Sequence, residues 1–464
     1  MDHRSAIRRL ALPGAVLLAL GGCTGGVAGK PGAAGLRDGL FPKLGNGGYD
    51  ADHYSLVLDY DPARAHLTGS MTMDARATQD LSAFNLDFAG MEVTGATVDG
   101  RRADANRAGT ELTLRPAEDL DEGARFRATV TYSGTPKTLT DQDGSHEGWL
   151  RTADGALALG EPTGSMAWFP SNNHPSDKAT YDIAVTVPRG LRAVSNGELT
   201  SSVTNGGRTT YTWRTREPMA SYLATVAIGA YDVTEGRTRS GIPFYDAVAP
   251  AARKETADVV GRLPEIVEWE REKFGPYPFS STGVIVAPEG SAEYALETQN
   301  RPVVPADQLD TETLAHELAH QWFGDSVTPE RWRDMWLNEG FATYAEWLWS
   351  EDHGGDSAQE HFDEEYAKDG SDAIWAFPPA APPSAARVSD QPVYVRGAMV
   401  VHQLRRALGD DAFFALVRGW TKDRAHANAS TEEFVRFVDE RSSGKDLDDL
   451  WDTWLYGDGK PDSP

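Results

Sequence analysis

The stretch that most constrains this chain is TETLAHELAHQWFGD, which places His316 and His320 four residues apart. Histidines at this spacing lie one turn apart on the same face of an α-helix. Two imidazoles in this arrangement can hold one metal ion, and nitrogen ligands suit zinc. Glu317 lies on the flank of that face, where its carboxylate can take a proton from a metal-bound water. The pattern predicts a helical metal site with a general base beside it.

A third ligand is expected, because catalytic zinc sites take three protein ligands and keep a fourth position for water. Glu339 follows His320 after 18 intervening residues, in the run WLNEGFATYAEW. Apolar residues recur in this run at helical spacing, and Thr328-Pro329 supplies a turn before it. We therefore predict two helices joined by a turn, with the second helix returning the Glu339 carboxylate to the metal.

The flanks of these motifs argue against an ordinary amphipathic helix with two surface histidines. HELAHQWFGD, then Trp332 and Trp336, then LNEGFA resemble the gluzincin aminopeptidases, the superfamily of aminopeptidase N and the leukotriene epoxide hydrolase. The resemblance implies one Zn²⁺ per chain, held by His316, His320 and Glu339, with Glu317 as the catalytic base. It extends over residues 49–461.

A second segment, SAEYALETQNRPVV, occupies the place of the family's substrate-edge motif, Gly-Ala-Met-Glu-Asn. By resemblance, Glu297 binds the free α-amine of a peptide, and the backbone around Ala295 pairs with the peptide like an added strand. Tyr294 stands in place of the family's glycine, where its side chain is expected to narrow the cleft.

Two more residues are carried over from the resemblance. Glu161, before the pair Phe169-Pro170, matches an acid of the family's amino-terminal domain that helps to hold the substrate amine, although Leu159 replaces the usual Gln. Tyr394, in VYVRGAMVVHQL, matches the family's catalytic tyrosine and is expected to stabilise the oxyanion. The alternatives are an ordinary surface glutamate and a packing tyrosine.

The fold class predicted is multi-domain α+β. From Tyr49 onward, apolar and polar residues alternate at period two, with turn residues between the runs, which predicts an all-β sandwich or saddle-shaped domain over residues 49–237. A thermolysin-like, mostly helical catalytic domain is expected over residues 238–464. Many relatives continue into a large helical domain, so this chain resembles a short form that lacks it.

The first residues predict a signal peptide over residues 1–22, because three arginines precede a short apolar core. The core ends at LGGC, which resembles a bacterial lipobox, so Cys23 is the predicted lipidation site and membrane anchor. A plain secretory signal is the alternative. The glycine-rich residues 23–48 predict a flexible tether. The enzyme is therefore expected outside the cytoplasm, either lipid-anchored or secreted.

The formal net charge of −26 opposes nucleic-acid binding, and an acidic cleft would prefer a cationic amino terminus. The favoured function is a zinc metallo-aminopeptidase that acts on peptides with a free amino terminus. A zinc-dependent epoxide hydrolase is the second hypothesis, since one branch of the superfamily uses the same site for that reaction. The third is an inactive peptidase-fold lipoprotein that only binds.

Overall fold

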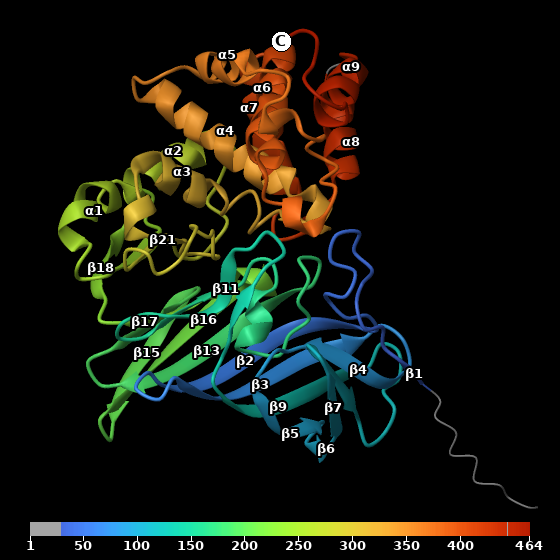
Figure 1. Cartoon of the computed structure of the whole chain (residues 1–464), viewed down its shortest axis with the longest axis vertical. Coiled ribbons are helices and arrows are strands. Elements are labelled where there is room, and N and C mark those ends of the chain that lie inside the picture. Colours follow the sequence, from blue (N-terminus) through green and yellow to red (C-terminus); the bar gives the residue numbers. More distant parts are fainter. Residues whose placement is uncertain (1–28, 443) are drawn as a thin grey trace, which may run out of the picture.

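The structure is a computed structural model that describes residues 29–442 and 444–464. Figure 1 shows that the first half of the chain is a β-rich domain and that most helices of the second half lie together on one side of it. This arrangement confirms the predicted fold class. The predicted signal peptide and Cys23 lie outside the described residues.

The β-rich domain is built on one large mixed sheet, in the order β15-β16-β13-β2-β3-β9-β5-β6. Buried and exposed residues alternate along its long strands, as the period-two pattern predicts. The strands are β2 (Tyr49–Asp61), β3 (His66–Ala77), β5 (Glu92–Val98), β6 (Arg101–Arg102), β9 (Arg125–Gly134), β13 (Lys178–Pro188), β15 (Glu198–Asn205) and β16 (Arg208–Ala220).

Two smaller sheets cover the inner face of the large one. Phe84 of β4 packs on Phe126 of β9 with 5.0 Å between ring centroids, and Trp149 of β11 packs on Tyr60 of β2 at 5.1 Å. The orders are β1-β4-β8-β7 and β10-β11-β12-β17-β14. Their strands are β1 (Lys30–Pro31), β4 (Leu81–Asp87), β7 (Asp104–Ala108), β8 (Glu111–Arg115), β10 (Thr138–Thr140), β11 (His146–Arg151), β12 (Ala156–Leu159), β14 (Arg192–Ser195) and β17 (Val226–Gly229).

A four-stranded sheet links the β-rich domain to the helices. β18 (Asp232–Arg237) pairs antiparallel with β19 (Pro243–Val248), which is followed in the sheet by the parallel strands β20 (Ile285–Ala287) and β21 (Val303–Pro305). The predicted domain boundary between residues 237 and 238 therefore falls inside a hairpin.

The helical part surrounds α4, which is buried along most of its length. Helix α3 packs on it from one side and α6 from another. The helices are α1 (Arg253–Val260), α2 (Leu263–Phe274), α3 (Thr311–Ala319), α4 (Trp336–Asp352), α5 (Ala358–Ala367), α6 (Gly397–Leu408), α7 (Asp410–Asp423), α8 (Thr431–Arg441) and α9 (Asp448–Leu450). None of the described helices combines the length and apolarity that a membrane crossing requires.

The predicted tether over residues 23–48 is wrong for its described part, residues 29–48. β1 pairs with β4, and the Phe41 ring is buried against Trp332 at 5.3 Å. The abundance of glycine in this segment serves close packing rather than flexibility. Gly45, for example, has φ +71°, and a Cβ there would lie 2.6 Å from the Cβ of His174.

Asp38 connects this segment to both domains through hydrogen bonds, and the pKa of its carboxyl group predicts how these bonds respond to pH. Burial alone would raise this pKa, but hydrogen bonds from His174 and from the backbone N–H groups of Phe41, Leu40 and Trp332 lower it to about 2. Because the folded-state pKa lies below the unfolded one, the carboxylate stabilises the fold above pH ~4, and its contribution is lost as pH falls towards 2. We expect Asp38→Asn to lower the free energy of unfolding by about 2 kcal/mol at pH 7.

Urea denaturation at a series of pH values measures this effect, and the difference between variant and wild type should shrink below pH ~4. Asp258→Asn, at an exposed position on α1, is the matched control and should change little. Equal stability of Asp38→Asn and wild type at pH 7 would show that the segment is not held by this carboxylate.

Candidate active site

The two histidines of the HExxH motif lie at the end of α3. The helix begins after Asp310, whose carboxylate caps it by accepting a hydrogen bond from the Thr313 N–H. His320 is the C-terminal cap and keeps helical backbone angles, with its N–H donating to the carbonyl of His316 at 3.3 Å. The two imidazole centroids therefore lie 4.7 Å apart, as one helical turn requires.

Helix α4 brings Glu339 to this pair. Oε2 of Glu339 lies 3.3 Å from Nε2 of His316 and 3.4 Å from Nε2 of His320. The carboxylate is 4% exposed, and its Oε2 has no hydrogen-bond partner among the described residues. The structure thus places all three predicted metal ligands together, with their nearest atoms facing one point.

Two residues that the sequence analysis did not single out orient the histidines. Nδ1 of His316 faces Oε1 of Glu346 at 2.5 Å, and Nδ1 of His320 faces Oδ1 of Asn338 at 2.5 Å. Each imidazole thus uses Nδ1 in a hydrogen bond and leaves Nε2 directed at Glu339. Glu346 follows Glu339 by seven residues, which is two helical turns, so helical spacing places both carboxylates on the same face and could have indicated Glu346.

This donor set fits zinc. Two imidazole nitrogens and one carboxylate oxygen are the usual protein ligands of a catalytic zinc ion, and partners at Nδ1 are typical of metal-bound histidines. The ligand atoms all lie within 4.8 Å of one another. Burial disfavours a charged imidazole, yet the carboxylates of Glu297 and Glu339 raise the pKa of His320 to about 10. The surroundings of the site therefore favour an added positive charge.

Glu317 lies on the same side of α3, next to the ligands. Its side chain is 5% exposed, lines the cavity, and has an Oε2 atom with no partner among the described residues. Burial raises the pKa of Glu317 to about 8, although the nearby His316 and His320 lower it in part. A carboxyl group that titrates close to neutral pH suits general acid–base catalysis.

The cavity above these residues has a volume of about 360 Å³ and contains the other predicted site residues. Glu297 is 3% exposed, and Asn338 Nδ2 donates to its Oε1 at 2.9 Å. Burial and the nearby Glu297 and Glu339 raise the pKa of Glu161 well above its usual value. Carboxylate oxygens of Glu161, Glu297 and Glu339 lie within 4.8 Å of one another. Ala295 lines the same cavity.

Tyr394 lies in a π-helical segment, Pro392–Arg396, that leads directly into α6. Its ring is nearly parallel to that of His316, at an angle of 9° and a centroid distance of 6.3 Å. Burial and the carboxylate of Glu339 raise the pKa of Tyr394 well above its usual value. The phenol therefore stays protonated at neutral pH and can donate a hydrogen bond into the cavity.

Other parts of the cavity wall were not predicted. The turn between β10 and β11 contributes Asp141, Asp143 and Ser145, and Ser389 contributes from the segment before α6. Tyr294, whose side chain was expected to narrow the cleft, does line the cavity, and its hydroxyl bridges the two domains by donating to the carbonyl of Glu161 at 3.1 Å. No local motif marks the turn between β10 and β11, because only the packing of the two domains brings this turn to the cavity.

Two family models match the chain. The model described as "Peptidase M1 N-terminal domain" matches residues 50–223, and "Peptidase family M1 domain" matches residues 282–454. Aminopeptidase M1 of Arabidopsis thaliana is 26% identical over 88% of this chain, and glutamyl aminopeptidase of Mus musculus is also 26% identical over 88%. The chain spans about half the length of these curated relatives, 50% and 47% respectively.

Solved structures match over nearly their whole length. The M1 zinc metallopeptidase from Deinococcus radiodurans is 31% identical, with a TM-score of 0.85 over 93% of this chain and 98% of that chain. A mutant of that protein bound to a Tyr-Ser-Ala substrate matches with a TM-score of 0.84 at 30% identity. With both of its domains matched and its zinc-ligand set assembled, the chain belongs to peptidase family M1.

Proposed function

We propose that this protein is a zinc metallo-aminopeptidase that removes amino-terminal residues from peptides. The observation that carries the proposal is the cavity that joins the triad of His316, His320 and Glu339 to the carboxylates of Glu297 and Glu161. The curated relatives reported above are named aminopeptidases, and the mutant neighbour is bound to a tripeptide substrate. Neither observation favours epoxide hydrolysis or an inactive binding protein.

His316, His320 and Glu339 would hold the zinc ion. When bound, zinc lowers the pKa of a water ligand and polarises a carbonyl group. Glu317 accepts the proton of the attacking water and returns it to the leaving amine. The position of Glu317 supports this role, because its side chain lines the same cavity as the three ligands and its Oε2 atom has no hydrogen-bond partner among the described residues.

Tyr394 stabilises the negative charge that develops on the carbonyl oxygen of the scissile bond. The phenol is protonated at neutral pH and lines the same cavity as Glu317. A donor placed where charge develops, in a site largely closed to water, stabilises the transition state more than the ground state. Tyr394 therefore acts on kcat rather than on substrate affinity.

Glu297 and Glu161 bind the ammonium group of the substrate, and this contact makes the enzyme an exopeptidase. Carboxylate oxygens of both residues lie within 4.8 Å of one on Glu339, so an ammonium group bound there would be close to the metal site, as cleavage after the first residue requires. A blocked amino terminus carries no charge and would leave the buried Glu297 and the half-buried Glu161 without a cationic partner.

We also propose that Cys23 carries a lipid that anchors the protein outside the cytoplasm. The proposal rests on the sequence alone, on the basic start, the short apolar core and the LGGC motif. An anchored enzyme would act on peptides at the outer face of a membrane.

Glu317→Gln and Tyr394→Phe test the two catalytic roles. Glu317→Gln keeps the shape but removes the base, so turnover of an aminoacyl reporter should collapse while zinc content stays at one per chain. Tyr394→Phe removes one hydrogen-bond donor, worth roughly 2.7–4 kcal/mol of transition-state stabilisation, so kcat should fall about 10²- to 10³-fold with little change in KM. Steady-state kinetics and metal analysis measure both effects.

Glu364→Gln, on the exposed side of α5, is the control and should behave like the wild type. A Glu317→Gln variant that retains turnover, or a Tyr394→Phe variant with wild-type kcat, would remove that residue from the mechanism.

Cys23→Ala should abolish lipidation and release the protein from the membrane fraction in soluble form. Fractionation of cells and mass spectrometry of the mature amino terminus make the measurement. Wild-type protein that is free in the culture fluid, with Cys23 removed or unmodified, would contradict the anchor and favour a plain secretory signal.

A further inference from the structure

Helices α4 and α6 touch backbone to backbone at one pair of glycines. A Cβ built on Gly340 would lie 2.8 Å from the carbonyl carbon of Gly397, and one on Gly397 would lie 3.0 Å from the Cα of Gly340. Cβ atoms essentially never approach other atoms to less than 3.0 Å. Any side chain at Gly340 would therefore push the two helices apart, and one at Gly397 would fit only if its neighbours moved.

This contact lies between two residues of the active site. Gly340 directly follows Glu339, and Tyr394 precedes Gly397 by three residues. Tyr394 therefore lies within one helical turn of the glycine contact. The separation of α4 and α6 at these glycines consequently sets how far the phenol stands from the Glu339 carboxylate.

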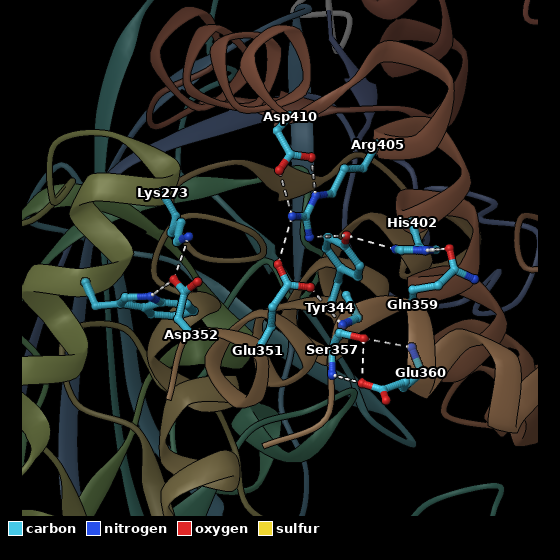
Figure 2. Close-up of polar contacts among 12 residues, drawn as sticks. Lys273, Tyr344, Glu351, Asp352, Ser357, Gln359, Glu360, His402, Arg405 and Asp410 are labelled. Carbon is cyan, nitrogen blue, oxygen red and sulfur yellow. Dashed lines mark hydrogen bonds and ion pairs between the residues drawn. The ribbon is translucent and has the colours of Figure 1, made fainter. Parts of the chain in front are cut away.

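A cluster around Arg405 holds the same two helices together farther along (Figure 2). Arg405 of α6 donates from Nη2 to Glu351 of α4 at 2.8 Å and from Nη1 to the Tyr344 hydroxyl at 3.3 Å. The Tyr344 hydroxyl also lies 3.1 Å from Nδ1 of His402 on α6, and Asp410 holds the guanidinium at 2.8 Å. These bonds oppose sliding or separation of α4 and α6.

The phenol of Tyr394 has no bond of its own to hold it in place. Within the described chain its hydroxyl has no hydrogen-bond partner, and its ring contacts His316. The neighbouring Arg396 is fully buried and fixes the backbone by donating to the carbonyls of Trp454 at 3.1 Å and Gly457 at 2.6 Å. The position of the phenol is therefore set by the backbone of the π-helical segment and of α6.

We propose that Gly340 and Gly397 are positioning residues for the oxyanion donor. Their contact, held closed by Arg405, fixes the phenol of Tyr394 at its working distance from the metal-ligand triad. The inference rests on the proposed function, because it assigns to the glycines an effect that is exerted through Tyr394.

Gly397→Ala is the variant of choice, because Gly340 adjoins a metal ligand. Gly397 has helical backbone angles, so alanine brings no backbone strain and by itself favours the helix. We expect kcat to fall about 10- to 100-fold, with KM and zinc content nearly unchanged. In a Tyr394→Phe background, the same change should lower kcat by less than about twofold, since the donor that it displaces is already gone.

Gly419→Ala on α7 is the matched control, since a Cβ there would meet the Phe437 ring at an ordinary 3.5 Å. It should leave kcat unchanged in both backgrounds. If Gly397→Ala does not fold, as judged by its melting temperature, Arg405→Gln is the second variant. It removes the bonds that hold α4 and α6 together farther along the helices. Its loss of kcat should be smaller and should depend on Tyr394 in the same way.

Losses that multiply in the double variant, or a Gly397→Ala enzyme with wild-type kcat, would overturn the positioning role while leaving the proposed function intact. Failure of the proposed function has a different signature, which is a zinc-loaded wild type that does not cleave peptides. A Tyr394→Phe variant with wild-type kcat would overturn the role of Tyr394 and the positioning role together.

Discussion

The approach of the Glu339 carboxylate to the imidazoles of His316 and His320 is the interaction on which the rest of the site depends. It joins α3 to α4, and the buried His320 and Glu339 with the half-buried His316 would be unfavourable together without a cation, because their ligand atoms face one another. A zinc ion held by these three residues would complete the site chemically and would link the two helices. The side chains of the three groups are 12% exposed or less, and this burial strengthens each electrostatic interaction among them.

The metal site and the amine site are connected through one side chain. Asn338 faces Nδ1 of His320 with its amide oxygen and donates from its amide nitrogen to Glu297. One residue next to Glu339 therefore contacts both a predicted metal ligand and the carboxylate that we propose binds the substrate amine. Under the proposed function, this link fixes the amine site relative to the metal site, although Glu297 comes from a different segment of the chain.

The sequence was informative wherever chemistry depends on short spacing. His316, Glu317 and His320 follow from one helical turn, and Glu339 follows from the apolar pattern of α4. Asn338 was overlooked because its role appears only when α3 and α4 pack together. The contact of Gly340 with Gly397 joins residues far apart in the chain, so no local pattern could indicate it. Composition was misleading for residues 29–48, where a few buried side chains such as Phe41 outweigh many glycines.

The most direct test of the central claim is the cleavage of one tripeptide by the zinc-loaded wild type, with its amino terminus either free or acetylated. Loss of the ammonium group removes a charge-assisted contact worth about 1.5–3 kcal/mol, or about ten- to more than hundredfold in kcat/KM. We expect the free peptide to lose its first residue and the acetylated peptide to remain intact. Equal cleavage of both peptides would contradict the assignment of Glu297 and Glu161 as the amine site, and with it the aminopeptidase function.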